Sequence, residues 1–294
     1  MKVNPLINEL TRGVWAMSFE GLLTYGPLAH KLLNGEKIEL NGFDQEPKAL
    51  ISYINQDGNK VKLDEAGRVP SGTIAVVDMI GAIIKYGDWC TYGADEIVGA
   101  LRAADNNPNI IATILNVDGP GGSVSAVAPF AEFGTTKKKP VVGLFDQCCS
   151  AHLYGMLSCV DHVMAGNTIS AAIGSVGVVL SWADNRKYLE KLGYVFHEVY
   201  PEESANKNEA FRLAMEGQYD MIKTEMLSPI AIKFQDAVKA ARPNLDLKVP
   251  GLITGKVFGA EAALEANLID SIGSMYRAIE MATMLAEINS VYKN

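Results

Sequence analysis

The sequence lacks the long apolar runs that membrane anchors and secretory leaders require. No window approaches about eighteen uninterrupted apolar residues, and the N-terminus, MKVNPLINELTR, has no apolar stretch followed by small residues. We therefore expect no membrane partner and a cytoplasmic location. Cysteine is also scarce, with four in 294 residues. The adjacent pair Cys148 and Cys149 lies in an apolar segment, which favours reduced, buried thiols over a disulfide framework.

Basic residues are fewer than acidic ones. There are 26 Lys and Arg against 34 Asp and Glu, a net charge of −8, and no basic block longer than the triplet at 137–139. This balance argues against nucleic acid as a partner. The hydrophobic share of 48% and the charged share of 20% are ordinary for a globular protein. The length suits one α/β core plus an extension.

The common cofactor motifs are missing too. The glycine-rich loop at 118–123 is followed by no G-K-[ST], and the G-x-G-x-x-G spacing is absent, so we expect neither a phosphate loop nor a dinucleotide site. A metal cluster could be assembled on paper, but its spacing fits no standard zinc pattern, and apolar packing is the preferred interpretation. Its members would be Cys148, Cys149, His152, Cys159 and His162. We predict no cofactor and no metal.

The chain divides by pattern into residues 1–70 and residues 71–294. The first part shows short helical patterns over 6–15 and 25–33, then turn signals, and is interpreted as an N-terminal extension that packs on the core or on a partner. From residue 71, predicted strands alternate with predicted helices, and the end of the chain is mostly helical. This alternation predicts an α/β fold with a parallel sheet, right-handed crossovers and C-terminal helices. The strands are expected over 73–80, 110–117, 141–145, 161–165 and 194–200, and the helices over 94–104, 123–133, 150–159 and 182–192.

Two of these predicted strands end in turns that carry groups suited to catalysis. After residues 110–117 comes DGPGGS, where Gly121 and Gly122 let backbone N–H groups face a carbonyl oxygen. After residues 141–145 comes Ser150, at the start of a helix. Acyl transfer needs a nucleophilic hydroxyl with backbone N–H donors beside it. Each piece alone also has an ordinary explanation, as a glycine turn and as a helix cap.

A catalytic serine needs a base. The G-x-S-x-G elbow is missing, and none of the four histidines stands in an obvious base position. Lys207 follows a predicted strand within a polar loop, where a solvated surface lysine is the simplest interpretation. A lysine can nevertheless replace histidine when burial leaves its amine neutral.

Five segments in series resemble the signal peptide peptidase (SppA) family of serine peptidases. They are DGPGGS (118–123), DQCCSAHLY (146–154), IGSVGV (173–178), SANKN (204–208) and TGKVFGAEAALEANLIDSIG (254–273). The resemblance implies a crotonase/Clp-like fold of repeated β-β-α units and a serine endopeptidase with a Ser–Lys dyad. Ser150 would be the nucleophile and Lys207 the general base. The amides of Gly121, Gly122 and Ala151 would form the oxyanion hole.

Within that family, the single peptidase unit and the missing membrane segment resemble phage head-maturation proteases. This likeness implies scaffold or capsid proteins as substrates, and a location in the host cytoplasm or the virion. It also implies a homo-oligomeric ring in which Lys207 of one subunit meets Ser150 of the next. Ala151 and His152 depart from the family's Gly-Gly after the serine.

Two alternatives remain open. A crotonase-type acyl-CoA enzyme would share the fold and the donor loop but would leave Lys207 unexplained. A catalytically inactive structural homologue would have its cleft blocked by Ala151 and His152.

Overall fold

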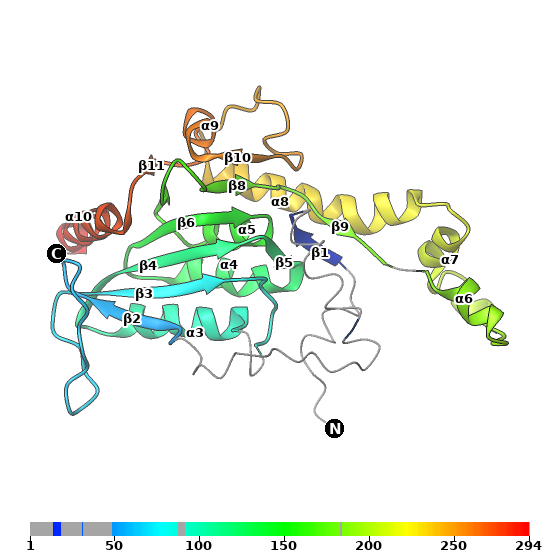
Figure 1. Cartoon of the computed structure of the whole chain (residues 1–294), viewed down its shortest axis with the longest axis horizontal. Helices are drawn as coiled ribbons and strands as arrows, with labels where there is room; N and C mark the ends of the chain where they lie inside the picture. Colours follow the sequence, from blue (N-terminus) through cyan, green and yellow to red (C-terminus); the bar gives the residue numbers. More distant parts are fainter. Residues whose placement is uncertain (1–13, 19–30, 32–48, 88–91, 183, 294) are drawn as a thin grey trace.

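The computed structural model describes residues 14–18, 31, 49–87, 92–182 and 184–293, and its centre is an eight-stranded sheet (Figure 1). Six strands follow the order β10-β8-β6-β4-β3-β2, while β7 pairs with β6 and β11 pairs with β7. Their bounds are β2 (Ile51–Ile54), β3 (Thr73–Ile80), β4 (Ile110–Gly119), β6 (Val141–Cys149), β7 (His162–Ala165), β8 (Ala172–Gly174), β10 (Val257–Gly259) and β11 (Ser271–Ile272).

The sheet is parallel through its middle. β3, β4 and β6 pair in parallel, and β6 also pairs in parallel with β7 and β8. The strands β2 and β10, at the two ends of the order, run antiparallel to their neighbours. The apolar run of β4 is mostly buried because helices cover both of its faces. The predicted α/β class with a parallel sheet is confirmed.

Helices pack on both faces of the sheet. Leu101, Phe130 and Leu153 bring α3, α4 and α5 into the core on one face. Ala278 and Ile279 anchor α10 on the other. Across the described ranges, no helix combines the length and the apolar character needed to cross a membrane. The bounds are α3 (Ala94–Asn106), α4 (Val127–Thr136), α5 (Ala151–Leu157), α9 (Ala260–Glu265) and α10 (Met275–Lys293), with a 3₁₀ turn η1 (Val124–Ala126) before α4.

An arm projects from this core. Figure 1 shows α6 and α7 at its outer end, joined back to the core by the long helical segment of η3 and α8. The predicted strand over 194–200 is wrong, since these residues have no regular structure and most are exposed. The elements are β9 (Val179–Leu180), α6 (Arg186–Lys191), the 3₁₀ turn η2 (Glu202–Ser204), α7 (Glu209–Met215), the π-helix η3 (Ile222–Leu227) and α8 (Ser228–Ala241).

Two stretches from residues 1–70 pair with the remainder of the chain. β2 is a strand of the main sheet, and β1 (Val14–Met17) forms a separate three-stranded sheet between β5 (Gly121–Ser123) and β9. The helical patterns predicted over 6–15 and 25–33 lie mostly outside the described residues, and Trp15 is in a strand. The division at residue 70 stays a prediction.

Candidate active site

The glycine loop and Ser150 meet at one edge of the sheet. β4 and β6 are parallel neighbours, and their register sets Gly119 opposite Cys148. The loop that follows β4 and the serine that follows β6 therefore leave the sheet side by side at the carboxyl ends of the strands. Ligand sites of open α/β sheets form at such edges.

Ser150 has an unusual backbone conformation. It lies between β6 and α5 with φ 55° and ψ −112°. The residue is buried, with 1% of its surface exposed. A positive φ is costly for a residue with a Cβ, and it persists where the surrounding structure imposes it. Here the Ser150 amide donates to the Gly174 carbonyl at 2.9 Å. The hydroxyl donates to the Gly177 carbonyl at 3.3 Å.

These two carbonyls belong to the IGSVGV segment, which thus lies against the serine. Gly174 has φ 133°, and a Cβ there would come within 2.4 Å of the Lys256 carbonyl oxygen. The next amide, of Ser175, donates to that same oxygen at 2.8 Å. Glycine is therefore required at position 174 by both its backbone angle and the close approach of residue 256.

The two glycines of the donor loop are also required by close backbone approach. Gly121 has φ 114°, and a Cβ on it would lie 2.2 Å from the Ala16 carbonyl oxygen. A Cβ on Gly122 would lie 1.9 Å from the Ile83 carbonyl oxygen. Side chains at these positions would push away β1 or the segment around Ile83. Ala151, the first residue of α5, has an amide with no acceptor inside its own helix.

His152 lies beneath the same loop. It is fully buried, and its Nδ1 accepts a hydrogen bond from the Gly121 amide at 3.1 Å. Its Nε2 has no hydrogen-bond partner within the described part of the chain. Burial lowers the pKa of His152 to about 3, so the ring is neutral near pH 7. With Nδ1 as an acceptor, the proton of the neutral ring sits on Nε2.

Lys207 is not brought alongside Ser150 within one chain. It is an exposed residue in the turn before α7, and its amide donates to the Ser204 carbonyl at 3.0 Å. Figure 1 shows α7 at the outer end of the arm, well apart from α5. The predicted nucleophile and the predicted oxyanion donors therefore gather at one place, whereas the predicted base stands elsewhere.

Three of the four cysteines, Cys148, Cys149 and Cys159, are buried in the core. Burial raises the pKa of the Cys148 thiol and raises that of Cys159 to about 12, which disfavours the thiolate that a metal ligand needs. Among the residues that the structure describes, no group of three or more His, Cys, Asp or Glu is placed to hold a metal ion.

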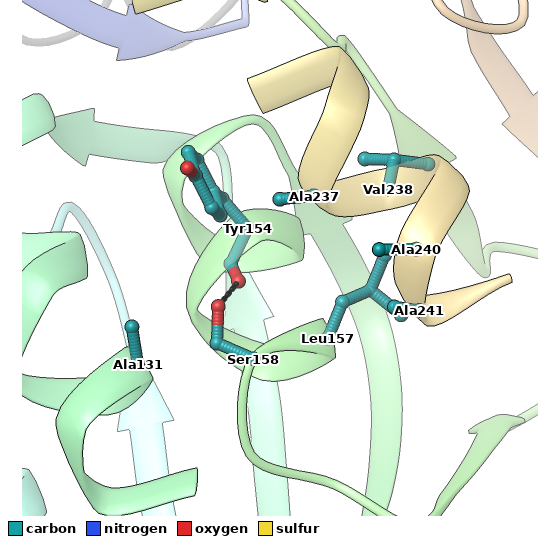
Figure 2. Close-up of a pocket in the computed structure, with 8 residues that line it drawn as sticks. All are labelled: Ala131, Tyr154, Leu157, Ser158, Ala237, Val238, Ala240 and Ala241. Atoms are coloured by element: carbon teal, nitrogen blue, oxygen red, sulfur yellow. Dashed lines mark hydrogen bonds between the residues drawn. The ribbon is translucent and has the colours of Figure 1, made fainter. Parts of the chain in front are cut away.

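A pocket lies near α5 but away from the predicted site residues. Figure 2 shows it between α5 and α8, with the Ser158 hydroxyl donating to the Tyr154 carbonyl at 2.7 Å. The remaining walls are apolar, formed by Ala131, Leu157, Ala237, Val238, Ala240 and Ala241. We assign no chemistry to this pocket.

One element beside the candidate site, β1, could not be recognised from the sequence. β1 contacts the donor loop directly, with Ala16 opposite Gly122 and Met17 opposite Gly121. A strand of four residues that pairs with a loop more than a hundred residues later leaves no local pattern. The IGSVGV segment was singled out by resemblance, and its carbonyls do lie beside the serine.

The chain is similar to a known peptidase family and to individual proteins. Residues 134–289 match the model of peptidase family S49. Protease 4 of Haemophilus influenzae is 30% identical over 217 residues, which cover 72% of this chain and 34% of that protein. The head-tail preconnector protein GP5 of enterobacteria phage P21 is 28% identical over 237 residues, 74% of this chain and 44% of that protein. This chain thus spans less than half the length of either relative.

Solved structures of low identity also align with part of the chain. A variant of the 1510-N membrane-bound stomatin-specific protease aligns with a TM-score of 0.45 at 15% identity, covering 70% of this chain and 82% of that one. An enoyl-CoA hydratase/isomerase family member aligns with a TM-score of 0.42 at 14% identity, covering 79% and 76%. The family match extends over more than half of the sequence, from α4 into α10. The chain belongs to peptidase family S49.

Proposed function

We propose that this chain is a serine endopeptidase with Ser150 as nucleophile and Lys207 as general base. The observation that carries the proposal is the Ser150 backbone, held at φ 55° in a strand-to-helix turn beside the glycine loop. Residues in such conformations cluster at active sites, because strain there fixes a reactive group in place. Membership of a peptidase family supports the same class of reaction.

In the proposed reaction, the Ser150 oxygen attacks the peptide carbonyl as its proton passes to the neutral amine of Lys207. The amides of Ala151 and Gly122 stabilise the oxyanion, and the Gly121 amide joins them only when it leaves Nδ1 of His152. Lys207 then gives its proton to the leaving amine, which releases the first product. A water molecule, deprotonated by Lys207, hydrolyses the acyl-enzyme and returns the serine to its starting state.

We further propose that Lys207 acts on Ser150 of a neighbouring subunit in a homo-oligomeric ring. The exposure of Lys207 and its place on the arm support this assignment. Large apolar side chains are exposed along the same arm, as expected of a surface that another subunit covers. They include Tyr188, Leu192, Tyr194, Val195, Phe196 and Val199. Such cover would remove the Lys207 amine from water, the condition under which a lysine serves as a base.

The proposed substrates are proteins cut during the assembly of a phage particle, such as a scaffold or capsid protein. The similarity to a phage head-tail preconnector protein supports this setting, which would place the chain in the host cytoplasm or the virion. The similarity to Protease 4 supports a protein substrate without specifying which.

A second candidate is a structural member of the family without catalysis. One observation favours it: the Gly121 amide is already bonded to His152 and is not directed at a substrate. If that bond persists, only the amides of Gly122 and Ala151 remain as donors for an oxyanion. The two candidates differ in whether Ser150 can be acylated.

The test is acylation of the full-length protein by a fluorophosphonate probe, with the labelled residue located by mass spectrometry. We expect label on Ser150, none in Ser150→Ala, and a rate reduced by about a hundredfold or more in Lys207→Ala. Ser158→Ala and Lys187→Ala are the matched controls and should label normally. Label that survives Ser150→Ala, or that is indifferent to Lys207→Ala, overturns the assignment.

A further inference from the structure

The donor loop is already paired with a strand from the same chain. β1 lies between β5 and β9 and runs antiparallel to both. On one side Ala16 stands opposite Gly122, and on the other Trp15 stands opposite Val179. β1 therefore fills the space between the glycine loop and the segment that follows IGSVGV, the two segments that flank Ser150.

The backbone bonds of this pairing engage the Gly122 amide. Ser18 donates to the Pro120 carbonyl at 2.7 Å, so Ser18 and Pro120 form a hydrogen-bonded position of the ladder. Such positions alternate in antiparallel pairs, which makes Ala16 and Gly122 the next one. The groups on either side of Gly122 agree, because the Gly121 carbonyl and the Ser123 amide bond to Ile83 on the opposite side. The Gly122 amide consequently faces Ala16.

Both pairings bring β1 close to the segments beside the serine. The β5 pairing sets Met17 opposite Gly121. The β9 pairing sets Trp15 opposite Val179, two residues after Gly177, whose carbonyl accepts the Ser150 hydroxyl hydrogen. Ala16, Met17 and Ser18 are buried, at 2%, 7% and 2% exposure. An extended peptide thus runs past the nucleophile with its backbone bonded to the donor loop.

We propose that residues 14–18 occupy the peptide slot of the active site as an internal pseudosubstrate and hold the enzyme inhibited. This inference rests on the proposed peptidase function. A substrate would enter as an extended antiparallel strand and make the backbone bonds that β1 now makes. It must first displace β1, which competes as a tethered strand at an effective concentration of about the millimolar range. The slot accepts an apolar segment with a small residue opposite Gly122.

A reversible lock tests the occupancy. Trp15 and Ser123 form a non-hydrogen-bonded pair, whose Cα separation of about 4.5 Å suits a disulfide. The test uses full-length Ser150→Ala carrying Trp15→Cys and Ser123→Cys, and a fluorescent peptide that copies residues 11–20. We expect oxidation to weaken peptide binding by about tenfold or more, and reduction to restore it. The two single-cysteine variants should not respond to the oxidant.

A second variant opens the slot. Ala16→Pro, in the same Ser150→Ala background, removes the amide that pairs with Gly122 and should tighten peptide binding by about tenfold or more. Ala16→Ser keeps the amide and serves as the control. Equal binding by the oxidised and reduced lock overturns the proposal, and that comparison decides the matter if Ala16→Pro fails to fold. Because binding to Ser150→Ala involves no catalysis, a wrong assignment of Lys207 would leave these results unchanged and would show only in the acylation test.

Discussion

The amide of Gly121 donates its hydrogen to Nδ1 of His152 across 3.1 Å, so that a buried imidazole holds one of the predicted oxyanion donors from below. The bond ties the first turn of α5 to the loop after β4. It also fixes the tautomer of a ring whose Nε2 has no partner among the described residues. His152, where the family pattern has glycine, is thus a positioning residue for the loop.

The buried ring predicts a pH-dependent stability. Burial lowers the pKa of His152 from 6.5 to about 3, so the unfolded chain binds more protons than the folded one between these values. The stabilisation is complete above the unfolded pKa, and it is lost as pH falls toward 3, by up to about 1.4 kcal/mol per pH unit. We expect His152→Asn to flatten this slope in urea unfolding measured from pH 7 to pH 4.

The control is His197→Asn, which alters a histidine on the exposed arm and should leave the slope as in the wild type. An unchanged slope in His152→Asn would show that other groups carry the acid sensitivity.

Gly122→Ala should cost about 2 kcal/mol or more of unfolding free energy. The added Cβ would meet the Ile83 carbonyl oxygen at 1.9 Å, and backbone on both sides of the loop must move to admit it. Gly99→Ala is the matched control, because Gly99 lies in the interior of α3 and a Cβ there meets nothing within 4 Å. It should raise the unfolding free energy by about 0.5–1 kcal/mol. Urea denaturation of both variants measures these changes in unfolding free energy. An unfolding free energy of Gly122→Ala equal to that of the wild type would refute the close packing.

The aspartate in the late segment of the family resemblance has a structural partner. Asp270 accepts one hydrogen bond from Arg242 at 2.9 Å and one from the Val163 amide at 2.8 Å, and its other carboxylate oxygen lies 2.8 Å from the guanidinium of Arg242 in an ion pair. Although burial raises the pKa of Asp270, these bonds lower it overall. We expect Arg242→Ala to destabilise by about 1–3 kcal/mol, because a carboxylate whose side chain is only 32% exposed loses its charged donor.

Arg277→Ala is the comparison for that measurement. Its guanidinium pairs with Glu280 on the exposed side of α10, where water screens the two charges, so we expect its removal to change the unfolding free energy little. Equal losses in the two variants would mean that the Arg242 pair behaves as an ordinary surface pair.

The strands β3, β4, β6 and β7 could be predicted because each is a largely apolar run between turn signals, whereas the short strands β2, β8, β10 and β11 carry no such run and were not predicted. The positions of Ser150 and the glycine loop followed from the same pattern, since parallel neighbours release their turns at one edge. β1 could not be predicted, because what makes it a strand is its partner loop. The prediction for residues 194–200 was wrong because their apolar side chains are typical of a strand, whereas among the described residues no strand pairs with them.

The assignment of Lys207 to a neighbouring subunit makes a prediction that no single-subunit site shares. Ser150→Ala and Lys207→Ala subunits are mixed in equal amounts, dissociated and reassembled, and acylation of Ser150 is followed on the Lys207→Ala subunits, which carry a mass tag. With random assembly, about half of those subunits neighbour an intact Lys207 and should regain the wild-type labelling rate. Mixing with a Ser150→Ala, Lys207→Ala double variant supplies no lysine and should restore nothing. If mixed rings form, as shown by native mass spectrometry, and labelling still does not recover, Lys207 does not act across the subunit boundary.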